Sequence, residues 1–178
     1  MSRIFGKVRQ LGYVVNDLDA SLARFERLGI GPFYRLDHAP LDYFRVNGKD
    51  MAIDLSIALG YSGGVQFELI QQHNPEGSPY KDFLDRNGEG LHHLCMWAED
   101  FEADVARWQS EGHRIVIDGM IGGARFVYFD SEMSPGTFVE IGDLRIWRAV
   151  MQRMENEAAH WDGRDPIRSM ADLVTEMA

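Results

Sequence analysis

Two acidic side chains occur inside apolar, strand-like segments of this sequence. Glu68 lies within residues 65–70 and Glu140 within residues 137–141. A strand alternates its side chains between two faces, so Glu68 shares a face with Gln66. An ionised carboxylate on the inner face of a sheet costs several kcal/mol unless a cation or a proton compensates its charge. Either glutamate alone could be an exposed strand position, but the two together predict a site that holds a cation.

Both glutamates belong to an internal repeat. Residues 64–69 align with residues 136–141, which makes Glu68 equivalent to Glu140. A longer stretch that starts at Gln10 aligns in the same way with one that starts at His93. A duplicated fold would relate these side chains by a pseudo-twofold axis. The repeat therefore predicts that Gln10, Glu68, His93 and Glu140 meet at one centre as metal ligands.

The types of these four side chains suit one divalent metal ion. Two carboxylates neutralise the charge of the ion, while a neutral imidazole and an amide oxygen add donors without charge. Mixed oxygen and nitrogen donors fit Zn²⁺, Ni²⁺, Co²⁺, Fe²⁺ or Mn²⁺, and the lack of a thiolate argues against a structural zinc site. Four protein ligands leave one or two positions open on an octahedral ion, where substrate oxygens could bind.

The elements expected around these residues follow the order β-α-β-β-β twice. Alternation over residues 7–15 predicts a strand, and Asn16 or Asp17 caps a helix that ends near Leu28. The same pattern restarts after a loop or short helix at residues 74–87. The other expected elements are strands at about 33–36, 52–59, 65–71, 91–98, 114–117, 125–129 and 137–141, and a helix at 101–111.

The remaining residues, 144–178, are predicted to form a helical extension. An apolar stripe is formed by Ile146, Trp147, Val150 and Met154. The helical pattern is interrupted at residues 162–163, and a second short helix is expected from about residue 165. Such a helix pair is typical of packing or dimerisation, and the alternative is a lid over the active site. The fold class is α+β, with a first module at 1–86, a second module at 87–143 and the extension at 144–178.

Composition limits the possible partners. The formal net charge of −10 over 178 residues argues against binding to nucleic acid or to anionic membrane surfaces. Residues 1–10 contain no apolar segment of a signal peptide, and no run of about 18 apolar residues occurs. A single cysteine, Cys95, excludes an internal disulfide and is expected to fill a small apolar space. We therefore expect a cytoplasmic protein that acts on a small molecule.

Other polar and aromatic side chains have less specific interpretations. By alternation, His92 points to the face opposite His93 and is expected to pack there or lie at the surface. Aromatic residues on strands could belong to the core or line an apolar substrate pocket: Phe33, Tyr34, Tyr43, Trp97 and Phe126. Three arginines on or near strands could bind a carboxylate or phosphate, or be surface charges: Arg35, Arg45 and Arg125.

The doubled β-α-β-β-β order, the segment 90–94 and the two strand glutamates together resemble the vicinal-oxygen-chelate superfamily over residues 7–142. That superfamily includes glyoxalase I, methylmalonyl-CoA epimerase, extradiol dioxygenases and the bleomycin- and fosfomycin-resistance proteins. The resemblance implies a cup-shaped mixed sheet made of two βαβββ modules. It also implies that Gln10, Glu68, His93 and Glu140 are the metal ligands. The modules of a homodimer could pair within one chain or across the two chains.

The details point to two branches of the superfamily. The Gln/Glu/His/Glu set resembles glyoxalase I, but residues 130–136 lack the Asp-Pro-Asp-Gly run that usually precedes its last ligand. Residues 67–70 and 90–93 look more like methylmalonyl-CoA epimerase, which usually has His at the position of Gln10 and Gln at that of Glu68. An extradiol dioxygenase would have His at the position of Gln10. Glutamine is a poor ligand for activating O₂ at iron, so this residue argues against dioxygenase chemistry.

These features predict a metal-dependent epimerase, isomerase or lyase that acts on a carbon acid next to a metal-bound carbonyl. Glu140 or Glu68 would loosen from the metal and move the proton as the catalytic base. The alternative is a non-catalytic protein of the same fold that sequesters a drug or metabolite. Sequestering relatives tend to lack the full ligand set, so its presence in this chain favours an enzyme.

Overall fold

The computed structural model describes residues 6–131 and 136–177 and confirms an α+β fold. Eleven strands form one mixed sheet in the order β11-β2-β5-β6-β1-β7-β10-β9-β8-β3-β4. The strands are β1 Val8–Val14, β2 Phe33–Leu36, β3 Leu41–Val46, β4 Lys49–Asp50, β5 Leu55–Ser62, β6 Val65–Gln72, β7 Gly90–Trp97, β8 Ile115–Ile121, β9 Ala124–Asp130, β10 Phe138–Gly142 and β11 Ile167–Ser169. The helices are α1 Leu18–Arg27, α2 Pro79–Asn87, α3 Phe101–Ser110, α4 Arg148–Ala159 and α5 Met170–Glu176.

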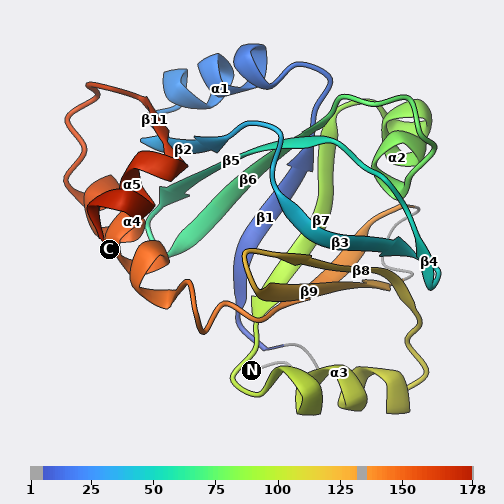
Figure 1. Cartoon of the computed structure of the whole chain (residues 1–178). Coiled ribbons are helices and arrows are strands. Elements are labelled where there is room, and N and C mark those ends of the chain that lie inside the picture. The colour runs from blue at the N-terminus through green and yellow to red at the C-terminus, as the bar shows by residue number, and fades with distance from the viewer. Residues whose placement is uncertain (1–5, 132–135, 178) are drawn as a thin grey trace.

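The two repeats of the sequence pair with each other within the chain (Figure 1). Strand β1 pairs antiparallel with β7, and these two first strands pair in parallel with β6 and β10, respectively. In each repeat, the ligand candidate on the first strand pairs with the residue two positions before the candidate glutamate. Gln10 pairs with Gln66, and His93 pairs with Phe138. The pseudo-twofold axis therefore passes between β1 and β7.

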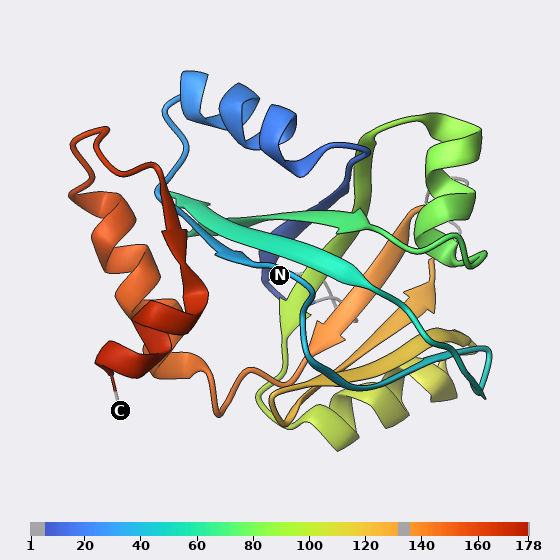
Figure 2. The ribbon, with the colours of Figure 1, turned by 45° about the horizontal axis from the view of Figure 1, so that its top comes forward.

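Helices α1 and α3 pack on the outer face of the curled sheet, one for each repeat (Figure 2). Each begins at an aspartate whose side chain accepts a hydrogen bond from a backbone N–H three residues later: Asp17 for α1 and Asp100 for α3. Buried Leu18 and Leu22 hold α1 on the sheet, and α3 packs through an apolar face that includes Trp108. These clusters leave the concave face of the sheet free for a cavity.

Three strands, β3, β4 and β11, were not expected from the sequence. Strand β3 forms a hairpin with β4 around a turn at Asn47-Gly48, and it pairs with β8 of the second repeat. In the extension, the second helix α5 begins at Met170 instead of near Asp165, because β11 first pairs in parallel with β2. Residues 132–135, part of the segment that departs from the glyoxalase pattern, lie outside the described residues.

The C-terminal extension packs against the sheet of the first repeat. Helix α4 contacts β5, and Met154 of α4 and Leu173 of α5 are buried in a cluster with residues of β2 and β5. The hydroxyl of Tyr34 on β2 donates to Glu157 of α4, which also pairs with Arg168 of β11. No helix in the described parts of the chain combines the length and apolarity needed to cross a bilayer. The expected homodimer stays a prediction.

Candidate metal centre

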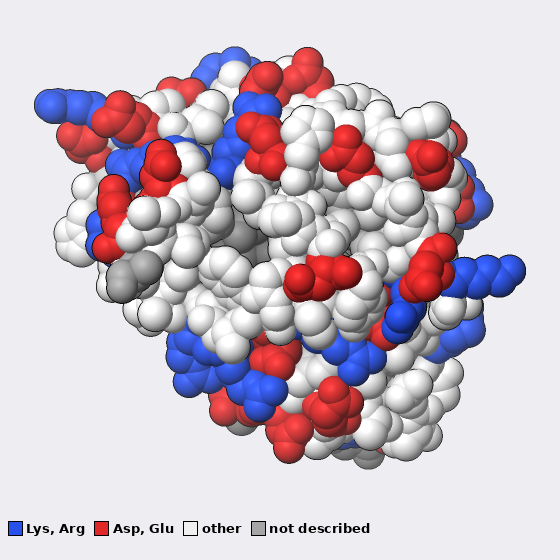
Figure 3. Space-filling view, in the orientation of Figure 1, with Lys and Arg blue, Asp and Glu red and all other residues white. Residues whose placement is uncertain are grey.

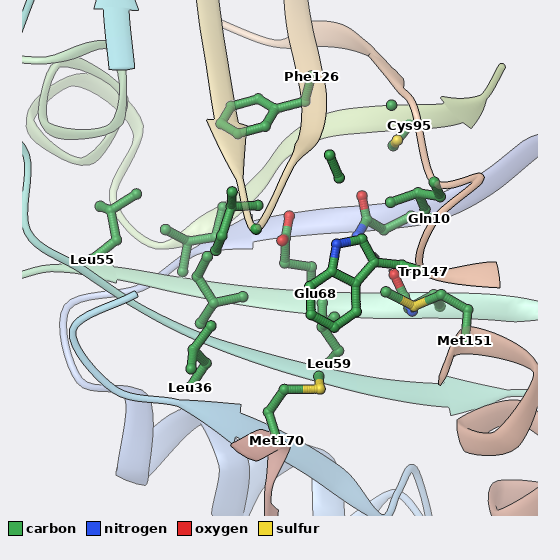
Figure 4. Close-up of a pocket in the computed structure, with 18 of the residues that line it drawn as sticks. Gln10, Leu36, Leu55, Leu59, Glu68, Cys95, Phe126, Trp147, Met151 and Met170 are labelled. Atoms are coloured by element: carbon green, nitrogen blue, oxygen red, sulfur yellow. Dashed lines mark hydrogen bonds between the residues drawn. The ribbon is translucent and has the colours of Figure 1, made fainter. Parts of the chain in front are cut away.

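The four central strands each contribute one of the predicted ligands to the concave face. Nε2 of His93 on β7 lies 3.1 Å from Oε2 of Glu68 on β6 and 3.0 Å from Oε2 of Glu140 on β10. One donor atom from each of these three residues lies within 4.8 Å of the other two. Gln10 of β1 lines the same cavity, and the side chains of Gln10 and Glu68 point into it (Figure 4).

Gly12 on β1 creates the space in which His93 lies. Its Cα pairs with that of Glu68 on one side and with that of His93 on the other. A Cβ atom at Gly12 would lie only 1.8 Å from Cε1 and 2.0 Å from Nε2 of His93. The imidazole therefore crosses β1 over a residue without a side chain, and this brings Nε2 between the two carboxylates.

His92 does not point away from His93, which corrects the expectation from strand alternation. The register of β1 and β7 shifts between the pairs Gly12–His93 and Tyr13–Leu91, so His92 has no partner on β1. This bulge breaks the alternation. Nδ1 of His92 lies 3.2 Å from Nδ1 of His93, and His92 is fully buried among aromatic rings. His92 thus packs as expected, but beside the candidate ligand.

The electrostatics of the cluster favour a bound cation. Burial by itself lowers the pKa of His93, but the carboxylates of Glu140 and Glu68 outweigh it and raise this pKa to about 9. Burial raises the pKa of Glu68, against the opposing effect of His93. Burial also raises the pKa of the Cys95 thiol, so this cysteine stays a protonated filler rather than a thiolate ligand.

Unpaired polar atoms provide the test of whether a metal ion fits. Gln10 Oε1, His93 Nε2 and Glu140 Oε2 are buried and lack a hydrogen bond of acceptable geometry, although Nε2 and Oε2 lie at ion-pair distance. Metal–ligand bonds of 2.0–2.2 Å place neighbouring ligand atoms of an octahedral ion about 3 Å apart, close to the 3.0 and 3.1 Å found here, and opposite atoms up to about 4.4 Å apart, within the 4.8 Å limit of the cluster. An imidazole, two carboxylates and an amide oxygen are donors for a divalent transition metal. The residues present therefore fit such an ion.

The side chain of Gln66 determines which end of the Gln10 amide faces the cavity. Nε2 of Gln66 donates to Sδ of Met151 at 3.1 Å and to the hydroxyl of Tyr61 at 2.9 Å. A thioether sulfur can only accept a hydrogen bond, so Oε1 of Gln66 must face Gln10. It accepts from Nε2 of Gln10 at 2.8 Å, which leaves Oε1 of Gln10 free to bind a metal ion.

Replacing Gln66 by leucine should therefore weaken metal binding without removing a ligand. The Gln10 amide would lose its orienting acceptor, and the loss of such an outer-sphere partner typically costs about 10- to 100-fold in metal affinity. The measurement is competitive titration of zinc against a fluorescent chelator. Met151→Leu, which removes only the sulfur acceptor, should cost less. Unchanged affinity in Gln66→Leu would contradict this orienting role.

The cluster lies in the wall of a cavity of about 410 Å³. Of the aromatic residues considered from the sequence, Tyr34 and Phe126 line this cavity. The other three do not: Phe33 is buried beneath α1, Tyr43 donates to Asp118, and Trp97 packs near the C-terminal helices. The three arginines are all paired with acidic side chains: Arg35 with Asp19 and Asp37, Arg45 with Asp50, and Arg125 with Asp118 and Glu102.

Comparison with known families defines the class of this protein. The chain belongs to the Glyoxalase/Bleomycin resistance protein/Dioxygenase superfamily, whose family model matches residues 9–129. This match includes three of the four ligand candidates and ends before Glu140. The resemblance inferred from the sequence is thereby confirmed. Among curated proteins, no relative was found.

Solved structures with the same fold include epimerases. A hypothetical protein from Bacillus halodurans C-125 is similar with a TM-score of 0.56 and 19% identity, over 77% of this chain and 93% of that chain. Methylmalonyl-CoA epimerase from Mycobacterium tuberculosis is similar with a TM-score of 0.53 and 19% identity, over 76% and 86%. A Streptomyces coelicolor methylmalonyl-CoA epimerase variant in complex with 2-nitronate-propionyl-CoA is similar with a TM-score of 0.52 and 21% identity, over 77% and 96%. At such low identity, the structural similarity shows a shared fold and nothing more specific.

Proposed function

We propose that this protein is a metal-dependent epimerase, isomerase or lyase that moves a proton at a carbon next to a carbonyl. The observation that carries the proposal is the convergence of Glu68, His93 and Glu140 within 4.8 Å at the wall of a cavity, with the free amide oxygen of Gln10 beside them. A bound divalent cation acts as a Lewis acid that polarises a substrate carbonyl and makes the adjacent C–H more acidic. Superfamily membership supports such a cofactor.

The two glutamates would carry the proton. They approach His93 Nε2 from β6 on one side and from β10 on the other, so they reach the cavity from opposite sides of the pseudo-twofold axis. One carboxylate can therefore take a proton from one face of a substrate carbon, and the other can return it to the opposite face. Burial raises the pKa of Glu68, which brings this group closer to the range of an efficient base near neutral pH.

Solvent exchange tests the proposal. In D₂O, the zinc-, nickel- or cobalt-loaded protein should incorporate deuterium next to the carbonyl of at least one of three probes, detected by proton NMR. The probes are methylmalonyl-CoA, the hemithioacetal of methylglyoxal and glutathione, and 2-hydroxypropiophenone. Removing the metal with a chelator should stop the exchange. If no probe shows metal-stimulated exchange, the proton-transfer mechanism is contradicted.

Glutamate variants identify the base. Glu140→Gln and Glu68→Gln should each slow exchange by about 10²- to 10⁴-fold, the usual contribution of a general base. Glu102→Gln is the matched control, because its side chain is 77% exposed and pairs with Arg125 away from the cluster. If both cluster variants exchange at the wild-type rate, neither glutamate is the base.

A second candidate is a protein that sequesters a small molecule without chemistry. The apolar lining of the cavity favours this function, because it would retain a neutral ligand by burial alone. The buried acidic cluster favours the enzyme, since a binding protein has no need of it. Metal analysis separates the two: less than one equivalent of divalent metal per chain, even after candidate ions are added back, would favour the binding protein.

A further inference from the structure

The C-terminal extension forms one wall of the cavity next to the candidate metal centre. Trp147, Met151, Met170 and Val174 all line it, although they lie outside the part of the chain that the family model matches. Trp147, Met151 and Met170 are labelled among the side chains that line the cavity in Figure 4, together with Glu68. The extension therefore contributes to the substrate site as well as to packing.

Several contacts hold this wall in place. Strand β11 pairs with β2, and the backbone N–H of Phe33 donates to the carbonyl of Pro166 at 2.8 Å. Glu157 accepts from the hydroxyl of Tyr34 and pairs with Arg168. The extension is thus joined to the sheet by a strand and a polar cluster, and it forms a fixed wall.

The charges that line the cavity restrict what it can hold. Among the lining residues that the structure describes, the charged ones are Glu68, Glu140 and Arg125. The guanidinium of Arg125 lies over the ring of Phe101 of α3, on the outer face of the sheet, and bonds both oxygens of Asp118 at 2.9 and 3.0 Å. The described lining therefore offers no free cation to a buried phosphate or carboxylate. Burying such an anion without a partner is costly.

Most of the remaining lining is apolar. Side chains from both repeats and from the extension contribute, including Leu36, Leu55, Ile57, Leu59 and Phe126. In the space-filling view, uncharged residues make up most of the face around the central hollow (Figure 3). A cavity of about 410 Å³ is within the range of sites that enclose most of a small organic molecule.

We propose that the substrate is a neutral, largely apolar carbonyl compound, such as an aryl or alkyl hydroxy-ketone, and that the C-terminal extension selects it. This inference rests on the proposed function, because the carbonyl oxygen is placed at the metal centre. The apolar part of the substrate packs against Trp147, Met170 and Val174. Anionic carriers, such as a CoA or glutathione group, gain no ion pair inside the cavity.

A series of hydroxamates tests the selection, because its members share one metal-binding head group and differ only in the attached group. With zinc-loaded protein, benzohydroxamate and octanohydroxamate should bind about 10- to 100-fold more tightly than acetohydroxamate, as expected for burial of an apolar group of this size. Calorimetric titration gives these affinities. Trp147→Ala and the milder Val174→Asn should each reduce this preference several-fold.

Ile146→Ser is the matched control within the extension, because Ile146 is 63% exposed and is not among the lining residues. Its hydroxamate preference should equal that of the wild type. Equal affinities for acetohydroxamate and benzohydroxamate would overturn the inference and leave the proposed function standing. Tighter binding of propionyl-CoA than of benzohydroxamate would also overturn the inference and leave the proposed function standing.

A second measurement separates failure of this inference from failure of the proposed function. In metal-free protein, the neutral dye N-phenyl-1-naphthylamine should gain fluorescence on binding, and Trp147→Ala and Val174→Asn should weaken that binding while Ile146→Ser should not. If no hydroxamate binds in a metal-dependent way but the dye shows this pattern, the metal-dependent function is wrong and the apolar wall is supported. If the dye binds all variants equally, the wall is contradicted.

Discussion

Replacing His93 by alanine is expected to abolish tight binding of a divalent metal ion. The imidazole is fully buried, and among the four ligand candidates it lies within ion-pair distance of both glutamates, at 3.1 and 3.0 Å. Loss of a direct ligand should cost more than the 10- to 100-fold typical of an outer-sphere partner. The measurement is zinc content after dialysis, together with competitive titration. We expect a fall from one equivalent per chain to nearly none.

The same variant should also be less stable in the absence of metal. Without the imidazolium, two buried carboxylates face each other with no cation, and breaking a buried ion pair from one side costs up to about 3–5 kcal/mol. Urea unfolding in the presence of a chelator measures this loss. His160→Ala, at an exposed position of the extension, should change neither property. A His93→Ala protein that still retains one equivalent of zinc would exclude the imidazole as a ligand.

The ligand candidates could be predicted from the sequence because the fold is duplicated. A single glutamate on a strand has little meaning, but Glu68 and Glu140 at equivalent positions, with Gln10 and His93 also equivalent, define one centre. The helices were predictable for local reasons: of the two caps expected for α1, Asn16 or Asp17, the structure has Asp17, and the repeat-equivalent Asp100 caps α3. The role of these four residues as metal ligands remains a prediction.

The features that sequence reasoning missed all depend on contacts between distant segments. Strand β3 pairs with β8, about 75 residues further along the chain, so no local sequence pattern predicts this strand. His92 lies in a bulge that strand alternation does not anticipate, and Gly12 acquires its importance only from the ring of His93 on the neighbouring strand. Met151 and Gln66 likewise meet only in the folded chain. One sequence signal could have predicted the close approach of the His93 ring: a glycine within a strand, next to a ligand position on the neighbouring strand.

Replacing Gly12 by alanine is expected to impair the metal site nearly as much as losing a ligand. The new Cβ would overlap the imidazole of His93, which cannot move aside easily because Tyr128 and His92 pack against it. The ring must leave the position between the two carboxylates. We expect a loss of about 100-fold or more in zinc affinity, and a loss of about 1–3 kcal/mol in stability from overpacking.

Gly60 provides a matched control for the overpacking. A Cβ atom there would lie 2.9 Å from the ring of Phe33, in the cluster beneath α1 and away from the metal centre. Gly60→Ala should therefore lose stability by a similar amount and keep its zinc affinity. If Gly12→Ala retains wild-type zinc affinity, His93 does not need the space over β1.

A double variant separates the steric effect from any other effect of alanine on β1. If the loss of stability in Gly12→Ala arises from the clash with the imidazole, removing that ring relieves it. The variant that combines Gly12→Ala with His93→Ala should then be no less stable than His93→Ala alone, so the two effects are strongly non-additive, as expected for residues in direct contact. Additive losses would mean that Gly12 acts through the strand backbone, and that His93 owes its place between Glu68 and Glu140 to its other neighbours.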